Sequence, residues 1–161
     1  MTVTGILSAT KPTAVDAGML VLRTGAGVVF VAHGYGDVFN AGITGNIANY
    51  RDAGIPLAAF SAPFTALVQL IGGALLVVGL FTRVWAACLT FVMLGALVFV
   101  HWGEPLVLNQ DGSGSGFAFI MGITSATLLL LGPGGFSLDA VLATRVRAAR
   151  GVAHERKPSS T

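Results

Sequence analysis

The feature that most constrains this chain is a series of four long apolar stretches with almost no charge inside them. Three contain no Asp, Glu, Lys or Arg, and the first contains only Arg23. A soluble domain of 161 residues would expose too much of its surface to hide a composition that is 54% hydrophobic. A bilayer core about 30 Å thick needs on the order of 20 helical residues, with about 17 still sufficient. All four stretches are predicted to meet this length, at about residues 17–35, 57–81, 84–100 and 116–131.

These stretches predict an all-α fold, a four-helix transmembrane bundle, because unpaired backbone amides cannot face hydrocarbon. We expect an N-terminal segment over residues 1–16, a membrane domain over 17–138 and a basic tail over 139–161. Pro63 falls within the second stretch and predicts a kink there. Lys11 precedes the first stretch as in a secretory signal, but the stretch is long and no small-x-small cleavage site follows it. We therefore interpret it as a retained span.

The cations predict the orientation. An even number of spans places both termini on one side, and the positive-inside rule makes that side the cytoplasm of a bacterial cell. The chain is thus predicted to be a multi-pass protein of the cytoplasmic membrane. The acidic residues Asp37, Asp52, Glu104 and Asp111 fall on the outer side. Arg51 is the one outer cation, whereas the predicted cytoplasmic ones are Lys11, Arg23, Arg83, Arg145, Arg147, Arg150, Arg156 and Lys157.

Several functional classes are disfavoured. Cys88 is the single cysteine, which excludes an intramolecular disulfide, a CxxC pair and a thiolate metal cage. The cations form no stripe interleaved with aromatics, so nucleic-acid binding is a poor interpretation. The chain also lacks a nucleophile elbow, a phosphate-binding glycine loop and an HExxH motif. A subunit of an oxidoreductase complex fits better than an autonomous enzyme, because the sequence carries no cofactor motif.

Two histidines are the most informative polar residues. The first and third spans both run outward, so His33 and His101 are predicted at similar depth near the outer interface. Asp37 follows His33 by four residues and Glu104 follows His101 by three, which places each pair on one face if the helices continue. Interfacial anchoring is the simplest account. A proton relay, a quinone-headgroup site, and a bound metal or haem are the alternatives.

Two other polar residues lie at membrane depth. Arg23 is expected to extend toward the headgroups, with a polar partner inside the bundle as the alternative. Gln69 is expected to hydrogen-bond across helices, and Gly72-Gly73 beyond it to allow close helix packing. The fourth stretch carries small residues at Gly114, Ala118, Gly122 and Ala126, a spacing that indicates a packing face within the chain or in a homo-oligomer.

Seven short segments follow one another over about residues 18–139: Leu22–Gly25, Val28–Gly34, Ala53–Pro56, Leu70–Gly73, Gly79–Arg83, His101–Gly103 and Leu131–Gly134. Together they resemble the DoxX family of membrane proteins. That resemblance implies a four-helix membrane bundle, often described as an oxidoreductase or a quinone-linked subunit. It also implies a glutamate where Gln69 stands, so that any proton-handling role of that carboxylate is lost or relocated here.

The leading hypothesis is a membrane subunit of a redox complex that anchors protein partners and contributes to a quinone site near His33 and His101. The first alternative is a structural or small-molecule-binding membrane module without redox chemistry. The second is a bis-histidine haem protein.

Overall fold

The computed structural model describes residues 12–107, 109 and 114–155, with only the backbone described for 150–155. Lys11, Asp111, Arg156 and Lys157, which enter the sequence predictions, lie outside the described residues. The described part is predominantly helical and contains no strand. The predicted all-α class is therefore confirmed for it.

The helices follow the apolar stretches closely. Two π-helical segments, η1 and η2, interrupt or extend them. The elements are α2 (Pro12–Tyr35), η1 (Gly36–Asn40), α3 (Gly42–Asp52), α4 (Ala58–Leu67), η2 (Val68–Gly72), α5 (Gly73–Val78), α6 (Thr82–Phe99), α7 (Gly116–Leu131) and α8 (Leu138–Glu155). Pro63 lies inside α4 rather than ending it, and the recorded irregularity is the π-helical turn that begins five residues later.

Three helical stretches are long and apolar enough to cross a membrane: Pro12–Asn40, Ala58–Val78 and Thr82–Phe99. The fourth helix, α7, has the predicted bounds but only 16 residues. At 1.5 Å per residue it is about 24 Å long, slightly shorter than the span predicted for it, so the four-helix transmembrane bundle is not confirmed and stays a prediction. Glycines surround it, since Gly114 and Gly116 stand at its start and Gly132 ends it.

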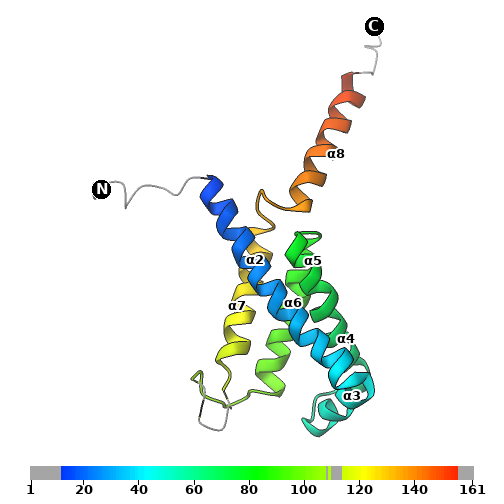
Figure 1. Ribbon diagram of the computed structural model, residues 1–161, viewed down its shortest axis with the longest axis vertical. Coiled ribbons are helices and arrows are strands. Elements are labelled where there is room, and N and C mark those ends of the chain that lie inside the picture. Colours follow the sequence, from blue (N-terminus) through cyan, green and yellow to red (C-terminus); the bar gives the residue numbers. More distant parts are fainter. Residues whose placement is uncertain (1–11, 108, 110–113, 156–161) are drawn as a thin grey trace, which may run out of the picture.

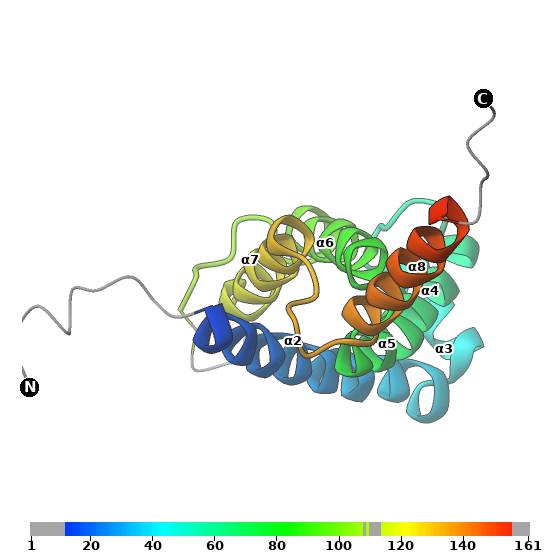
Figure 2. The same cartoon turned by 90° about the horizontal axis from the view of Figure 1, so that it is seen from above.

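The long helices pack side by side (Figures 1 and 2). α2 lies against α4, η2 and α5. Of these, η2 and α5 contact α6, and α6 and α7 form the most extensive helix pair. The start of α2 and the whole of α8 lie at one end of the molecule, called the α8 end below, and α3 lies at the opposite α3 end (Figure 1). α8 projects away from the other helices, and its side chains from 141 to 149 are exposed.

Glycines bring the helices into backbone contact. A Cβ on Gly27 would lie 2.6 Å from the Gly73 carbonyl oxygen, and one on Gly34 would lie 2.8 Å from the Ala66 carbonyl oxygen. Gly72 instead faces the indole of Trp85. The predicted packing role of Gly72-Gly73 is thus confirmed, because both positions are filled by neighbouring helices.

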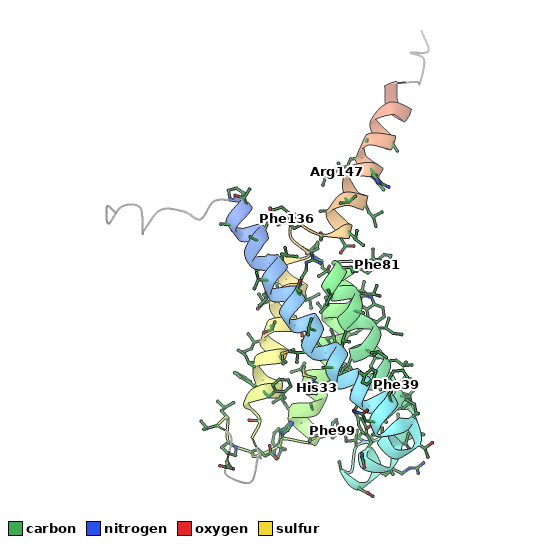
Figure 3. All side chains as sticks on the ribbon, viewed as in Figure 1. His33, Phe39, Phe81, Phe99, Phe136 and Arg147 are labelled. Atoms are coloured by element: carbon green, nitrogen blue, oxygen red, sulfur yellow. The ribbon has the colours of Figure 1, made fainter. Side chains whose placement is uncertain are left out.

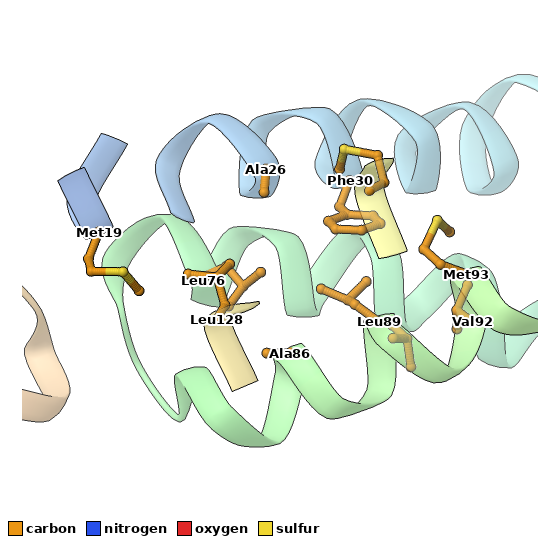
Figure 4. Packing of buried hydrophobic residues seen from close by; sticks show 11 residues of the cluster. Met19, Ala26, Phe30, Leu76, Ala86, Leu89, Val92, Met93 and Leu128 are labelled. Atoms are coloured by element: carbon orange, nitrogen blue, oxygen red, sulfur yellow. The ribbon is translucent and has the colours of Figure 1, made fainter. Parts of the chain in front are cut away.

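The apolar core lies where the helices meet (Figure 4). Phe30 of α2 and Leu89 of α6 are almost fully buried, as is Leu128 of α7. The small-residue face of α7 also points inward, since a Cβ on Gly122 would lie 3.4 Å from the Met93 side chain. This face is packing surface within the chain. The cluster comprises Met19, Ala26, Phe30, Val68, Leu76, Ala86, Leu89, Val92, Met93, Met121 and Leu128.

Candidate functional site

His33 stands in the last turn of α2, in the half of the molecule nearer the α3 end (Figure 3). Its ring stacks on Phe117 in the first turn of α7, with centroids 5.0 Å apart and planes inclined by 20°. Its Nδ1 lies 2.9 Å from the Val29 carbonyl oxygen. Because a carbonyl only accepts hydrogen bonds, Nδ1 must carry the proton, and in the neutral ring Nε2 is an acceptor. The side chain is exposed, so Nε2 can meet a ligand.

Asp37 follows in η1, so the chain does continue as a helix from His33, although with π-helical geometry. Its carboxylate interacts electrostatically with His33, but the described residues contain no ion pair between the two within 4.0 Å. Asp37 also faces Tyr50 of α3. Burial raises the pKa of Tyr50 and the nearby Asp37 charge raises it further, while a side-chain hydrogen bond with Thr65 acts in the opposite direction.

His101 and Glu104 form the second predicted pair. His101 Nδ1 lies 2.7 Å from Glu104 Oε2, and each side chain is less than a third exposed. The pair does not share a helical face, because α6 ends at Phe99 and a turn brings the two residues together. Glu104 also accepts a hydrogen bond from the Gly114 amide at 3.0 Å, and its backbone oxygen accepts one from the Ser115 hydroxyl at 3.2 Å. Glu104 therefore holds the connection that leads into α7.

Both predicted pairs thus meet the start of α7: His33 packs on Phe117, and Glu104 binds the two residues just before the helix. The two histidines therefore lie at the same end of the helices, and their location at the outer interface stays a prediction. Even so, the part of the chain that the structure describes contains no group of three or more His, Cys, Asp or Glu side chains that could hold a metal ion. The geometry therefore does not fit a metal ion held by His33, Asp37, His101 and Glu104.

Arg23 contradicts the expectation that it extends toward the headgroups. Its side chain is only 2% exposed. Nη1 donates to the backbone oxygens of Leu76 at 3.1 Å and Val77 at 3.0 Å, and Nη2 donates to that of Phe136. The first two acceptors belong to the last turn of α5, where helix carbonyls carry partial negative charge, and the Leu76 oxygen also accepts the Gly79 amide at 3.0 Å. The structure instead agrees with the alternative, in which Arg23 has polar partners inside the bundle.

The buried position of the Arg23 guanidinium depends on neighbouring residues at the α8 end. Gly79 ends α5 with a φ of 70°, and a Cβ there would collide with the guanidinium. Asp139, in the first turn of α8, accepts hydrogen bonds from the amides of Phe81 at 2.8 Å and Thr82 at 2.9 Å, at the start of α6. Asp16 accepts one from the Gly135 amide at 2.6 Å. The base of α8 is therefore tied to α2, α5 and α6 at once.

Gln69 lies inside η2 and is 7% exposed. Its carbonyl oxygen Oε1 is buried without a hydrogen-bond partner, so the predicted bond across helices is not made by this atom. π-helical turns inside α-helices are frequent at functional sites, because they displace the helix surface that follows. Trp85 of α6, whose neighbour is Gly72, also has a buried and unpartnered Nε1.

Sequence reasoning missed the aromatic and carboxylate partners of these groups. Phe117 gives no signal as the ring beneath His33, because any residue of an apolar helix could face that way. Asp139, at the start of the basic tail, gives no signal either, because nothing in the sequence shows that its carboxylate accepts hydrogen bonds from the amides at the start of α6.

The fold and the placement of polar groups define a helical membrane protein with several apolar helices. The chain belongs to the DoxX family, whose sequence model, described as DoxX, matches residues 18–102. This confirms the family resemblance noted in the sequence. No solved structure matches the chain.

Two curated relatives support the same assignment. "Putative oxidoreductase CatD" of Bacillus subtilis (strain 168) is 31% identical over 124 residues, covering 77% of this chain and 86% of the relative. "Uncharacterized membrane protein Rv3486" of Mycobacterium tuberculosis (strain ATCC 25618 / H37Rv) is 30% identical over 172 residues, covering 92% of this chain and 98% of the relative. One name refers to an oxidoreductase and the other to a membrane.

Proposed function

We propose that this chain is a membrane subunit of a redox assembly and that it contributes a quinone-headgroup site at the α3 end through His33. The observation that carries the proposal is the state of the His33 ring. It is exposed, it is oriented by Phe117 and by the Val29 carbonyl, and Nε2 is left as an acceptor. An oriented imidazole in a membrane protein is suited to bind a hydroxyl group or to take a proton.

His101 has a different role in this proposal. Its Nδ1 is engaged by Glu104, and Glu104 in turn holds Gly114 and Ser115. The pair therefore positions the start of α7, and with it Phe117, rather than contacting the headgroup.

The proposed topology is four crossings of a bacterial cytoplasmic membrane with both termini in the cytoplasm. It is supported by the eight-to-one distribution of cations and by the common end shared by the start of α2 and α8 (Figure 1). In this arrangement α8 is a cytoplasmic helix on which a partner subunit can be anchored. Reporter tags at the two termini test the topology, and tags on opposite faces would contradict it.

The site is tested by His33→Ala in the native membrane assembly, with oxidation of a hydroquinone as the assay. Loss of one hydrogen bond of about 1.4 kcal/mol predicts a decrease in turnover of about tenfold. Tyr35→Phe is the matched control, because it removes an exposed hydroxyl near the same end and should leave turnover unchanged. Equal turnover in the His33→Ala variant and the wild type would reject the site.

The alternative of a structural or small-molecule-binding module is weakened by one finding. Such a module would use the small-residue face of α7 and the basic tail as its interaction surfaces, but Gly122 on that face packs against Met93 within the chain. Purification from native membranes separates the hypotheses, since a redox partner that co-purifies supports the first and a homo-oligomer alone supports the second. A Soret band in the purified protein would establish the haem alternative.

A further inference from the structure

A groove runs along the α2–α7 boundary beneath His33. It is an open hollow of about 280 Å³ between the two helices. His33 and Phe117 stack one helical turn beyond Val29 and Met121, so this ring pair stands at the end of the groove nearer the α3 end. The groove is lined by Val21, Leu22, Gly25, Ala26 and Val29 of α2 and by Met121 and Thr124 of α7.

The lining of the groove is suited to an unbranched or isoprenoid hydrocarbon chain. Its one hydroxyl, on Thr124, already donates to the Ile120 carbonyl oxygen at 2.8 Å. The remaining lining side chains are apolar. Gly25 has no atom within 4 Å of the place where its Cβ would stand, which leaves the groove open along that turn. Hydrocarbon is therefore the part of a ligand that this surface can cover without leaving a polar group unpaired.

Nε2 of His33 determines which kind of headgroup can form a hydrogen bond at the end of the groove. Nδ1 of His33 is committed to the Val29 carbonyl oxygen, so Nε2 of the neutral ring accepts a hydrogen bond and cannot donate one. A hydroxyl can donate to it, whereas a quinone carbonyl and a phospholipid phosphate diester are acceptors. The site thus complements a hydroquinone better than the oxidised quinone.

We infer that the α2–α7 groove together with His33 forms a binding site for a long-chain hydroquinone. The isoprenoid chain lies along the groove, and a headgroup hydroxyl donates its hydrogen bond to His33 Nε2. This inference rests on the proposed function, and it adds the redox form of the ligand and the path of its chain.

The test is equilibrium binding to the full chain in lipid nanodiscs under anaerobic conditions. The probes are menaquinol, its oxidised form menaquinone, and menadiol, which has the headgroup without the chain. We expect menaquinol to bind about tenfold more tightly than menaquinone, the difference that one hydrogen bond makes.

Gly25→Leu fills the groove and should weaken menaquinol binding about tenfold while leaving menadiol binding unchanged. Gly95→Leu on α6 is the matched control, because Gly95 also has no atom within 4 Å of its Cβ position but does not line the groove. If Gly25→Leu fails to fold, Thr124→Phe fills the same groove from α7. His33→Ala should remove the preference for the reduced form.

The outcomes separate the two proposals. Menaquinol binding that is unaffected by Gly25→Leu and Thr124→Phe would overturn the groove, and an acyl chain of the surrounding lipid would then be its occupant. Equal affinities for menaquinol and menaquinone would overturn the selection by His33. If menaquinol binds but the His33→Ala variant binds it equally well, the proposed headgroup site fails together with this inference.

Discussion

Replacing Arg23 with methionine tests how the buried guanidinium stabilises the α8 end. The variant keeps the length of the side chain but removes the donors for Leu76, Val77 and Phe136. Hydrogen bonds from a charged donor contribute about 1.5–3 kcal/mol each, so three contribute roughly 4.5–9 kcal/mol. Burying the charge costs several kcal/mol, which the methionine avoids. The difference leaves an expected loss of about 2–4 kcal/mol in the free energy of unfolding.

The assay is reversible unfolding in mixed micelles, titrated with a denaturing detergent and followed by tryptophan fluorescence. Arg83→Met is the matched control: Arg83 is exposed and makes one long hydrogen bond, 3.4 Å to the Leu130 oxygen. We expect this control to lose less than about 1 kcal/mol. Arg23→Lys should recover part of the stability, because it keeps the charge but not the planar fork that reaches three oxygens.

A second readout follows the segment that Arg23 holds. Without its donor to the Phe136 oxygen, the connection between α7 and α8 should be cut faster by chymotrypsin in the Arg23→Met variant. Equal losses of stability in the Arg23→Met and Arg83→Met variants would refute the reasoning. So would an unchanged cleavage rate beside a large loss, because the loop would then not depend on the guanidinium.

Three further predictions follow from the packing and the caps. Gly34→Ala should destabilise the fold by more than about 2 kcal/mol, because its Cβ would press on rigid backbone of the neighbouring helix. Gly18→Ala is the control and should change little, because open space surrounds its Cβ position. Equal unfolding curves for the two variants would contradict this prediction. Asp139→Ala should cost about 1–2 kcal/mol as the α6 amides lose their acceptor, and a loss below about 0.3 kcal/mol would count against the cap. Ultraviolet titration should find Tyr50 ionising above the ordinary value of about 10. Because burial favours the neutral phenol, the stability that it contributes is fully present below about pH 10 and is lost as the pH rises through the raised pKa of the folded protein.

The extent of the helices could be predicted because charge and hydrophobicity change abruptly at their ends. The fourth helix matches its predicted bounds, and the third begins two residues before the predicted start. The π-helical segments could not be predicted, because they depend on how a neighbour presses on the turn rather than on a local pattern. The same holds for α3, a short helix in a segment treated as a connection between spans.

The candidate site was predicted only in part. Topology was enough to place His33 and His101 at the same end, but His101 and Glu104 meet through a turn rather than on the predicted helical face. Spacing and topology could not show that Glu104 binds Gly114 and Ser115, or that His33 stacks on Phe117, because these contacts join segments far apart in the sequence. The error at Arg23 has the same origin: its oxygen acceptors are backbone atoms, which carry no residue-specific signal.

The bonds of Arg23 also set an order for assembly. Its acceptors lie 53, 54 and 113 residues further along the chain, so a newly inserted first helix has none of them available. At that stage the guanidinium can only turn to water and headgroups at the nearby helix end. The guanidinium can replace water and headgroups with all three carbonyl oxygens only after the segment containing Phe136 has been synthesised. The first helix to enter the bilayer is accordingly among the last to reach its final seat.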